Sequence, residues 1–364
     1  MSPIPIVSVL TPAYNQSATI RACIESVRAQ TLADWEMIVV DDGSTDATAE
    51  IAASFGDPRI QVIRQENKGL FRLAETYNAA LNVARAPLVA ILEADDLWPP
   101  GKLARQAPDF DRPEVVLSWG RAQMVGSGGE AIDLVPHELP PEDARFNWPV
   151  GRALAHLCRH QWLTFAFPVT LVIRTEALRR IGGFRQPPDL PLVDLPTLLA
   201  LALEGEWAFH EESCGIWRRH EASATASRLP AIIEGAYRLV ADFARGEGAR
   251  APVSAEEWAE IDEGWRAFQY ERCLMLGRML ASGGRRREAA HAFSRAAALA
   301  GRARGASLGR AAAMLSGLGL SPEAVFRVAG KPHWREQAFL PGGDPLVDAS
   351  TKPEHIATHE IGTT

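Results

Sequence analysis

The sequence has few cysteines, no excess of positive charge and no long apolar run. Its 364 residues include four cysteines, which are widely spaced and form no Cys-x-x-Cys pair, so neither a disulfide framework nor a zinc site is predicted. The formal net charge of −7 argues against a nucleic-acid partner. Because the chain contains no stretch of about eighteen uninterrupted apolar residues and no signal-like N-terminus, we expect a cytoplasmic protein without a membrane span.

The N-terminal part alternates β-rich segments with helical segments. Strands are predicted at 4–10, 35–40, 60–64 and 88–92, and helices at 17–30, 44–55 and 70–85. The alternation predicts the α/β class, with a Rossmann-like, mostly parallel sheet and flanking helices. In such sheets ligands bind beyond the carboxyl ends of the strands. Three of these ends carry polar groups, at 11–15, 41–42 and 93–96, so we expect a ligand site there.

The rest of the chain is less regular at first and then becomes helical. Strands are predicted at 115–119, 170–174 and 207–210, and helices near 149–158 and 194–204. From about residue 230 the pattern changes to helices, two of which are expected to pack antiparallel around Gly283–Gly284. The sequence therefore predicts a C-terminal α-helical region that follows the α/β part.

Three carboxylates, those of Glu93, Asp95 and Asp96, follow the predicted strand at 88–92. Strand side chains alternate, so two acids separated by one residue can face the same side. Such a group costs free energy near a buried strand unless a positive charge offsets it. Oxygen ligands of this kind suit Mg²⁺ or Mn²⁺. The alternative interpretation is a solvated acidic loop before the helix that follows Pro99–Pro100.

A second acidic group follows the strand at 35–40. Asp41 and Asp42 are placed to accept hydrogen bonds from a nucleobase or a ribose hydroxyl. The alternative is that they form Asx turns and helix caps, which Asp favours in any protein. For Asp46, a few residues further on, we favour this second interpretation, an Asx turn or a helix cap.

Several segments, in this order, resemble the bacterial-type inverting family-2 glycosyltransferases, which have the GT-A fold. The opening "VSVLTPAYNQSATIRACIESVRAQTLADWEMIVVDDGSTDATAEIAA" is similar nearly position by position, and "PLVAILEADDLWPPGKL" looks like the family's DxD segment. "VTLVIRTEALRRIGGFR" and "WRRHEASAT" are similar to two later landmarks of the family. The resemblance covers roughly residues 4–225.

The resemblance implies a function and a domain organisation. The expected reaction is metal-dependent transfer of a sugar from a nucleotide-diphosphate sugar, by default a UDP-sugar, to a hydroxyl of a glycan or lipid-linked acceptor. The expected GT-A domain spans 1–228, with a nucleotide-binding half at about 1–110 and an acceptor half at about 111–228. A helical region is expected at 229–335, and a disordered tail at 336–364.

The resemblance also implies which residues bind the donor and the ion. Thr11, Pro12, Ala13, Tyr14 and Asn15 would line the base pocket, Asp42 or Asp41 would bind the base, and Arg72, Arg218 and Arg219 would face the diphosphate. Asp95 would meet the ribose or the metal, and Asp96 and His220 would hold the metal. The ion, Mn²⁺ or Mg²⁺, would act as a Lewis acid on the departing nucleoside diphosphate.

Asp194 stands where the family has its general base, with Asp189 as the second candidate. The residue type also suits a helix N-cap, and both roles are compatible. Three residues depart from the family pattern: Glu93 replaces the usual Asp, Val193 the usual Glu, and Tyr77 a frequent Arg. These departures leave one alternative function, a catalytically degenerate nucleotide-sugar-binding protein.

Two other enzyme classes fit the sequence less well. A dehydrogenase is disfavoured because "TPAYNQSA" stands after the first strand in place of a Gly-x-Gly-x-x-Gly segment. A glycoside hydrolase needs two opposed carboxylates, whereas these acids share one strand end.

An arginine-rich stretch at 284–310 is predicted to be a solvated helical face. The alternative is contact with anionic lipid, which would place the protein at the inner face of a membrane beside a lipid-linked acceptor. The C-terminal helices also offer a surface for oligomer formation.

Overall fold

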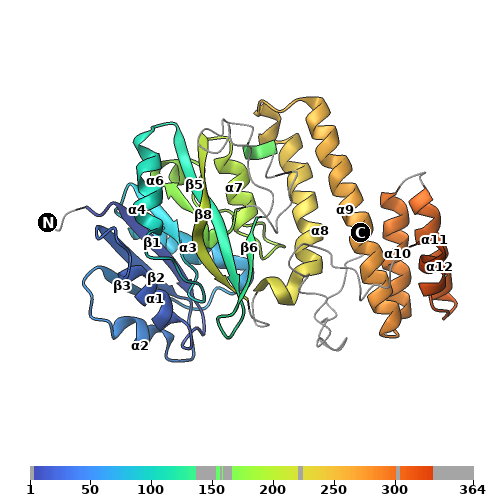
Figure 1. The fold of residues 1–364 in the computed structure, drawn as a ribbon, viewed down its shortest axis with the longest axis horizontal. Coiled ribbons are helices and arrows are strands. Elements are labelled where there is room, and N and C mark those ends of the chain that lie inside the picture. Colours follow the sequence, from blue (N-terminus) through green and yellow to red (C-terminus); the bar gives the residue numbers. More distant parts are fainter. Residues whose placement is uncertain are drawn as a thin grey trace. The chain divides into compact units, whose positions relative to one another are not determined.

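The computed structural model describes residues 4–136, 153–155, 158, 166–219, 224–300 and 304–330 (Figure 1). The chain divides into two compact units, one made of Met1–Ala224 with Gly235–Ala255 and the other of Thr225–Glu234 with Glu256–Thr364. The boundary expected at residue 228 lies inside one helix, α8 (Ala224–Arg245).

The first unit is built on one eight-stranded sheet. Its strands are β1 (Val7–Ala13), β2 (Trp35–Asp41), β3 (Ile60–Arg64), β4 (Leu88–Ile91), β5 (Val115–Val125), β6 (Ala131–Val135), β7 (Val172–Arg174) and β8 (Glu206–Arg218). They run in the order β3-β2-β1-β4-β7-β5-β6, with β8 paired to β5. Strands β1 to β4 are mutually parallel, β7 is antiparallel to β4 and β5, and β8 is parallel to β5. The predicted α/β class and mostly parallel sheet are confirmed.

The first four strands lie at or near their predicted positions, with β1 beginning three residues later than expected; the apolar pattern of β1, β2 and β4 reflects burial, whereas β3 is only partly buried. Every residue of β1 and of β2 is buried. Two strands extend well beyond their predicted lengths, since β5 and β8 pair with each other as far as Val125 and Arg218 despite polar residues along both. Strand β6 was not predicted, because most of its residues are exposed or only partly buried. The predicted helix at 149–158 lies mostly outside the described residues.

Short helices connect the strands of the first unit. They are α1 (Ile20–Arg28), α2 (Thr48–Ala53), α3 (Leu73–Val83), α4 (Lys102–Gln106), α6 (Thr175–Arg180) and α7 (Asp194–Leu201). Helix α1 shows how the sequence fixes the packing, since it buries Ile20, Cys23, Ile24 and Val27 at helical spacing. These side chains join the core cluster that also contains β1 and β2 residues.

The carboxyl ends of three parallel strands meet at one edge of the sheet. Ala13 at the end of β1 is in register with Asp41 at the end of β2, and Leu10 of β1 with Ile91 of β4. The polar segments that follow these strands therefore emerge side by side, as the sequence pattern predicts.

The second unit contains the C-terminal helices, which confirm the predicted helical region. Helix α9 (Ala255–Ser282) leads through Gly284, at a φ of 77°, to α10 (Arg286–Leu299), α11 (Arg304–Gly317) and α12 (Glu323–Val328). The phenyl rings of Phe293 and Phe326 lie 5.7 Å apart in its core. In the part of the chain that the structure describes, no helix is both long and apolar enough to cross a membrane.

A pair of glycines after α6 lets the chain dock closely on α3. Gly182 and Gly183 have φ angles of 90° and 88°, a left-handed conformation that favours glycine. Asn78 of α3 then forms two hydrogen bonds with Phe184: its Nδ2 donates to the Phe184 carbonyl at 2.9 Å, and its Oδ1 accepts from the Phe184 amide at 2.8 Å. A Cβ on Gly183 would lie 2.4 Å from that Oδ1, whereas one on Gly182 would meet nothing within 4 Å.

We expect Gly183→Ala to destabilise the protein more than Gly182→Ala. Both substitutions force alanine into positive φ, at about 1 to 2 kcal/mol, but only Gly183→Ala also disturbs the Asn78 hydrogen bonds, at about 1 to 3 kcal/mol more. Urea unfolding followed by tryptophan fluorescence measures both losses. Equal losses would contradict this, because they would mean that Asn78 moves aside without cost.

A fully buried lysine lies in the segment that follows the acidic residues. Lys102 begins α4, and its Nζ donates to Gln106 Oε1 at 2.6 Å and to the Thr170 and Leu171 carbonyls at 3.4 and 3.5 Å. The same nitrogen lies 4.6 Å from the centre of the Trp98 ring. Burial lowers the pKa of Lys102 to about 7, because the charged form loses its hydration.

We expect this lysine to make the protein more stable as the pH rises above about 7. The unfolded chain, in which the lysine has its ordinary pKa of 10.5, binds a proton that the folded protein has released, so the free energy of unfolding increases with pH between the two values. Lys102→Met should flatten this rise, as measured by urea unfolding at pH 7 and pH 9. Lys68→Met, at a partly exposed lysine, is the control and should retain the wild-type slope; an unchanged slope in Lys102→Met would contradict the expectation.

Candidate active site

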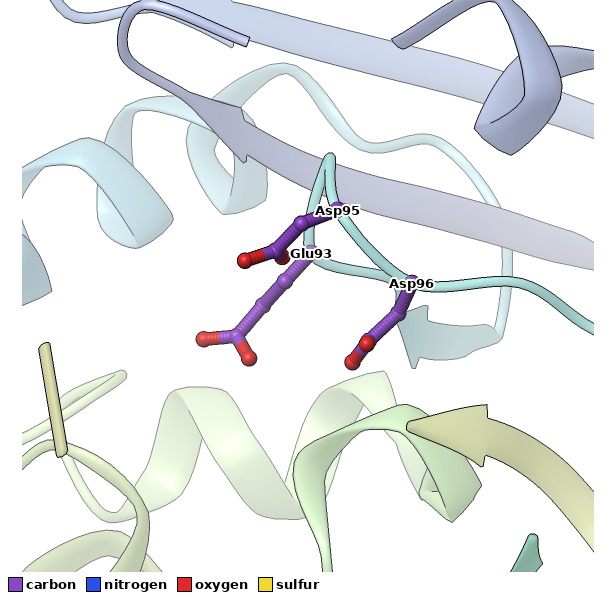
Figure 2. Close-up of side chains that lie close together, drawn as sticks. All are labelled: Glu93, Asp95 and Asp96. Carbon is purple, nitrogen blue, oxygen red and sulfur yellow. The ribbon is translucent and has the colours of Figure 1, made fainter. Parts of the chain in front are cut away.

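Glu93, Asp95 and Asp96 form an acidic cluster directly after β4 (Figure 2). One carboxylate oxygen of each residue lies within 4.8 Å of the others. The turn is fixed by the end of β8, because the amide of Arg218 donates to Asp96 Oδ1 at 2.8 Å. Leu97 and Ile216 exchange two backbone hydrogen bonds, of 3.1 and 2.9 Å. The acidic cluster is therefore held between β4 and the end of β8.

Burial and mutual repulsion raise the pKa of two members of the acidic cluster. For Asp96, which is 2 % exposed, burial is the largest cause, followed by the charges of Asp95 and Glu93. For Glu93, burial and the charge of Asp95 raise the pKa to about 7, and the charge of Asp194 acts in the same direction. A divalent cation would relieve this repulsion, and three carboxylates are the oxygen ligands that Mg²⁺ and Mn²⁺ prefer. The residues present thus fit such an ion.

Two departures from the family pattern contact each other. Tyr77 of α3 donates from its hydroxyl to Glu93 Oε1 at 2.7 Å. The tyrosine is 3 % exposed, and its ring lies 4.8 Å from that of Phe184. The longer arm of Glu93 is therefore fixed by a neutral partner where the family frequently has arginine. Tyr77 is not among the predicted site residues. The sequence nevertheless contains an indication of its role, because Tyr77 and Glu93 both depart from the family pattern.

Asp194 is the first residue of α7, and the structure brings its charge near the acidic cluster. It raises the pKa of both Glu93 and Tyr77. Burial raises the pKa of Asp194 itself, although its Oδ1 accepts a hydrogen bond from the Leu195 amide at 2.8 Å. The N-cap position belongs to Val193, so the N-cap interpretation of Asp194 is wrong. The second base candidate, Asp189, has a side chain 63 % exposed that pairs with Arg238 at 3.2 Å.

The two aspartates after β2 both bind nearby protein groups. Asp42 accepts hydrogen bonds from the Gln65 side chain at 2.6 Å and from the amides of Lys68 and Gly69 at 3.0 and 3.3 Å. Asp41 is fully buried, and its Oδ2 lies 3.3 Å from Arg64 Nε. Both carboxylates thus shape the loops beside the β1 end, and their assignment to a nucleobase stays a prediction.

The segment predicted to line the base pocket begins inside β1. Thr11 is fully buried, and its hydroxyl has no hydrogen-bond partner among the described residues. Pro12 and Ala13 are buried, while Tyr14 is 49 % exposed. Asn15 has a φ of 53° and accepts the Thr45 amide at 2.8 Å. The end of β1 therefore presents the buried hydroxyl of Thr11 and the exposed ring of Tyr14.

Asp46 joins the two loops and forms the expected Asx turn, but the N-cap position of α2 belongs to Ala47, so the helix-cap part of its interpretation is wrong. It accepts the Ser17 amide at 3.0 Å and the Thr48 amide at 3.0 Å. Burial acts to raise its pKa, but hydrogen bonds from Thr48 and Ser17 hold the value at about 2. The carboxylate therefore stays ionised and bound to the protein.

The predicted cationic residues lie in three different situations. Arg72 is exposed and forms two hydrogen bonds to Glu75, of 2.6 and 2.7 Å. Arg219 is partly buried directly after β8, where its amide donates to the Val125 carbonyl at 2.8 Å. His220 lies outside the described residues. The structure therefore brings Asp95 and Asp96 together with Glu93 and the backbone of Arg218, and the charge of Asp194 acts on Glu93. The predicted histidine ligand is not among the described residues.

The chain is similar to known proteins both in sequence and in structure. The family model described as glycosyl transferase family 2 matches residues 8–182. TuaG of Bacillus subtilis strain 168, which is named as a teichuronic acid biosynthesis glycosyltransferase, is 32 % identical over 216 residues, covering 58 % of this chain and 77 % of TuaG. The Escherichia coli enzyme UDP-Glc:alpha-D-GlcNAc-diphosphoundecaprenol beta-1,3-glucosyltransferase WfgD is 32 % identical over 165 residues, covering 45 % of this chain and 64 % of WfgD.

The fold is also found among solved structures. S. aureus TarS 1–349, crystallised in complex with UDP-GlcNAc, superposes with a TM-score of 0.56 at 18 % identity, covering 89 % of this chain and 92 % of that one. At this identity the likeness concerns the fold, which is the GT-A fold. The similarity to most of TuaG at 32 % identity, with which the matching family model agrees, shows that this chain belongs to glycosyl transferase family 2.

Proposed function

We propose that this chain transfers a sugar from a UDP-sugar to a hydroxyl of a lipid-linked glycan, with inversion at the anomeric carbon and with bound Mn²⁺ or Mg²⁺. The observation that carries the proposal is that Asp194 lies near enough for its charge to act on Glu93, a member of the acidic cluster. One group supplies oxygen ligands for an ion beside a diphosphate, and the other supplies a buried carboxylate with a raised pKa.

In the proposed reaction Asp194 removes the proton from the acceptor hydroxyl. Burial raises its pKa, which makes the carboxylate a stronger base. The acceptor oxygen forms a bond to the anomeric carbon from the face opposite the nucleotide, and the bond from that carbon to the diphosphate oxygen breaks. A cation held by Asp95 and Asp96 would neutralise the charge on the departing diphosphate. Tyr77 orients Glu93, the third carboxylate of the cluster.

The donor and acceptor classes are proposed from the relatives. WfgD is named for a UDP-glucose donor and a diphosphoundecaprenol-linked acceptor, and TarS was crystallised with UDP-GlcNAc. The alternative function, a binding protein without catalysis, is favoured by Val193 and Glu93. We prefer the enzyme because Asp194 is present beside the acidic cluster and Glu93 is fixed by a specific hydrogen bond.

The test is a transfer assay with purified protein, Mn²⁺, a panel of UDP-, GDP- and dTDP-sugars and a short-chain lipid-diphosphate sugar as acceptor. We expect one UDP-sugar to give product, whose anomeric configuration, read by NMR, is opposite to that of the donor. Retention of configuration would overturn the inverting mechanism. Donor binding with neither transfer nor hydrolysis would establish the binding protein instead.

A further inference from the structure

Four large apolar side chains are exposed near the end of the second unit. Met314 and Leu318 are 62 % and 67 % exposed, Leu320 is 57 % exposed, and Val328 is 91 % exposed. Leu318 donates its amide to the Met314 carbonyl at 3.0 Å, which continues the helical hydrogen-bond pattern one residue beyond the end of α11. Met314 and Leu318 therefore lie on the same side of this helix.

Arginines accompany these apolar side chains, and exposed acids do not. Arg310 lies one turn before Met314 on α11, Arg327 directly precedes Val328, and both are exposed. The acid between residues 307 and 330 is Glu323, which is partly buried and bound to Arg278 at 2.8 and 2.7 Å. The exposed charged residues of this segment are thus all positive, and they lie among exposed apolar side chains.

The core of the second unit does not use these side chains. The opposite sides of α11 and α12 supply its buried residues, among them Ala312 and Phe326. The guanidinium of Arg278 lies 4.4 Å from the Phe326 ring and also binds Glu323. Among the described residues none covers these exposed apolar side chains, so they are available for a partner.

We propose that this surface, made of Arg310, Met314, Leu318, Leu320, Arg327 and Val328 and called here the docking face, binds an anionic lipid bilayer. The apolar side chains would enter the headgroup region while the arginines contact lipid phosphates. The charge argues against a second copy of the chain as the partner, because a symmetric contact would bring like charges together. The inference rests on the proposed function in one respect, since a lipid-linked acceptor lies in such a bilayer.

The experiment is vesicle flotation with the full chain, without donor or acceptor. Phosphatidylcholine vesicles are compared with vesicles that contain about one third phosphatidylglycerol, at low and high salt. We expect binding to the anionic vesicles that weakens with salt. Met314→Ser combined with Leu318→Ser should weaken binding about tenfold or more, and Arg310→Gln combined with Arg327→Gln should remove most of its salt dependence.

The matched control is Ile132→Ser on β6, because Ile132 is an apolar side chain 45 % exposed outside the docking face. It should bind as wild type does, and circular dichroism should show that all variants remain folded. Absence of binding to anionic vesicles, or binding that the docking-face variants leave unchanged, overturns the inference. A dimer in light scattering that Met314→Ser with Leu318→Ser dissociates would assign the face to a second copy and also overturn it.

Failure of this inference is distinguishable from failure of the proposed function. Transfer to a water-soluble, short-chain acceptor needs no bilayer, so it should persist when vesicle binding is absent. Vesicle binding without any transfer activity would instead contradict the transferase and leave the docking face standing.

Discussion

Asp194→Asn is expected to abolish sugar transfer and leave donor binding intact. The amide cannot accept the proton of the acceptor hydroxyl, so kcat should fall by about 10² to 10⁴. The side chain keeps its shape and its hydrogen bond from the Leu195 amide, so α7 should remain in place. Initial rates of transfer, together with the Kd of the UDP-sugar from calorimetry, measure the two effects separately.

The control for this variant is Asp189→Asn. Asp189 is the second base candidate, but its side chain is largely exposed and pairs with Arg238 on α8. We expect wild-type kcat in this control. A loss of kcat in Asp189→Asn, with normal turnover in Asp194→Asn, would exchange the two roles.

The pH profile gives a second measure of the base. Burial holds the pKa of Asp194 above the ordinary value of 3.8, and a general base works only when deprotonated. The acidic limb of kcat should therefore lie above the range of an ordinary aspartate, with the rate increasing as the pH rises through it. A profile without this limb would exclude a buried carboxylate as the base.

Asp96→Asn is expected to remove the stabilisation that nucleotide and metal give together. In wild type, UDP with Mn²⁺ at about 100 times the Kd should add about 2.7 kcal/mol to the free energy of unfolding. The variant loses one carboxylate of the acidic cluster, so UDP should stabilise it equally with Mn²⁺ and with EDTA. Thermal unfolding in each of these conditions measures the difference.

The same substitution has an opposite effect on the protein without ligand. Burial and the charges of Asp95 and Glu93 raise the pKa of Asp96, so its ionised form opposes folding at neutral pH. Asp96→Asn should therefore leave the ligand-free protein as stable as wild type or more stable. Asp189→Asn, outside the cluster, is the control for both effects. Retention of the Mn²⁺-dependent stabilisation in Asp96→Asn would contradict the metal site.

The N-terminal part of the sheet could be predicted because its sequence pattern is local. Strands β1 and β2 are apolar along their whole length, and the polar residues begin where the strands end. Strand β8 could be predicted only in part, because Glu211 and Glu212 interrupt its apolar pattern. Its length depends on pairing with β5, which lies about ninety residues earlier in the chain.

The candidate site likewise has features that follow from the local sequence and features that depend on distant contacts. The members of the acidic cluster are neighbours in sequence, so their proximity follows from one turn. The bond from the Arg218 amide to Asp96 joins residues 122 positions apart, and no local pattern indicates it. The bond from Tyr77 to Glu93 joins α3 to the turn after β4, and α3 is itself bound through Asn78 to Phe184, 106 positions later in the chain.

The contact between Tyr77 and Glu93 makes these two positions interdependent in evolution. Glu93→Asp alone would shorten the arm and leave the buried tyrosine hydroxyl without its acceptor, whereas Tyr77→Arg alone would place a longer cation in a site packed for a ring. Changed together, the two substitutions restore the combination that the family frequently has. A lineage can therefore cross between the two pairs only through a weakened intermediate, and double-mutant cycles should show strong coupling at these positions.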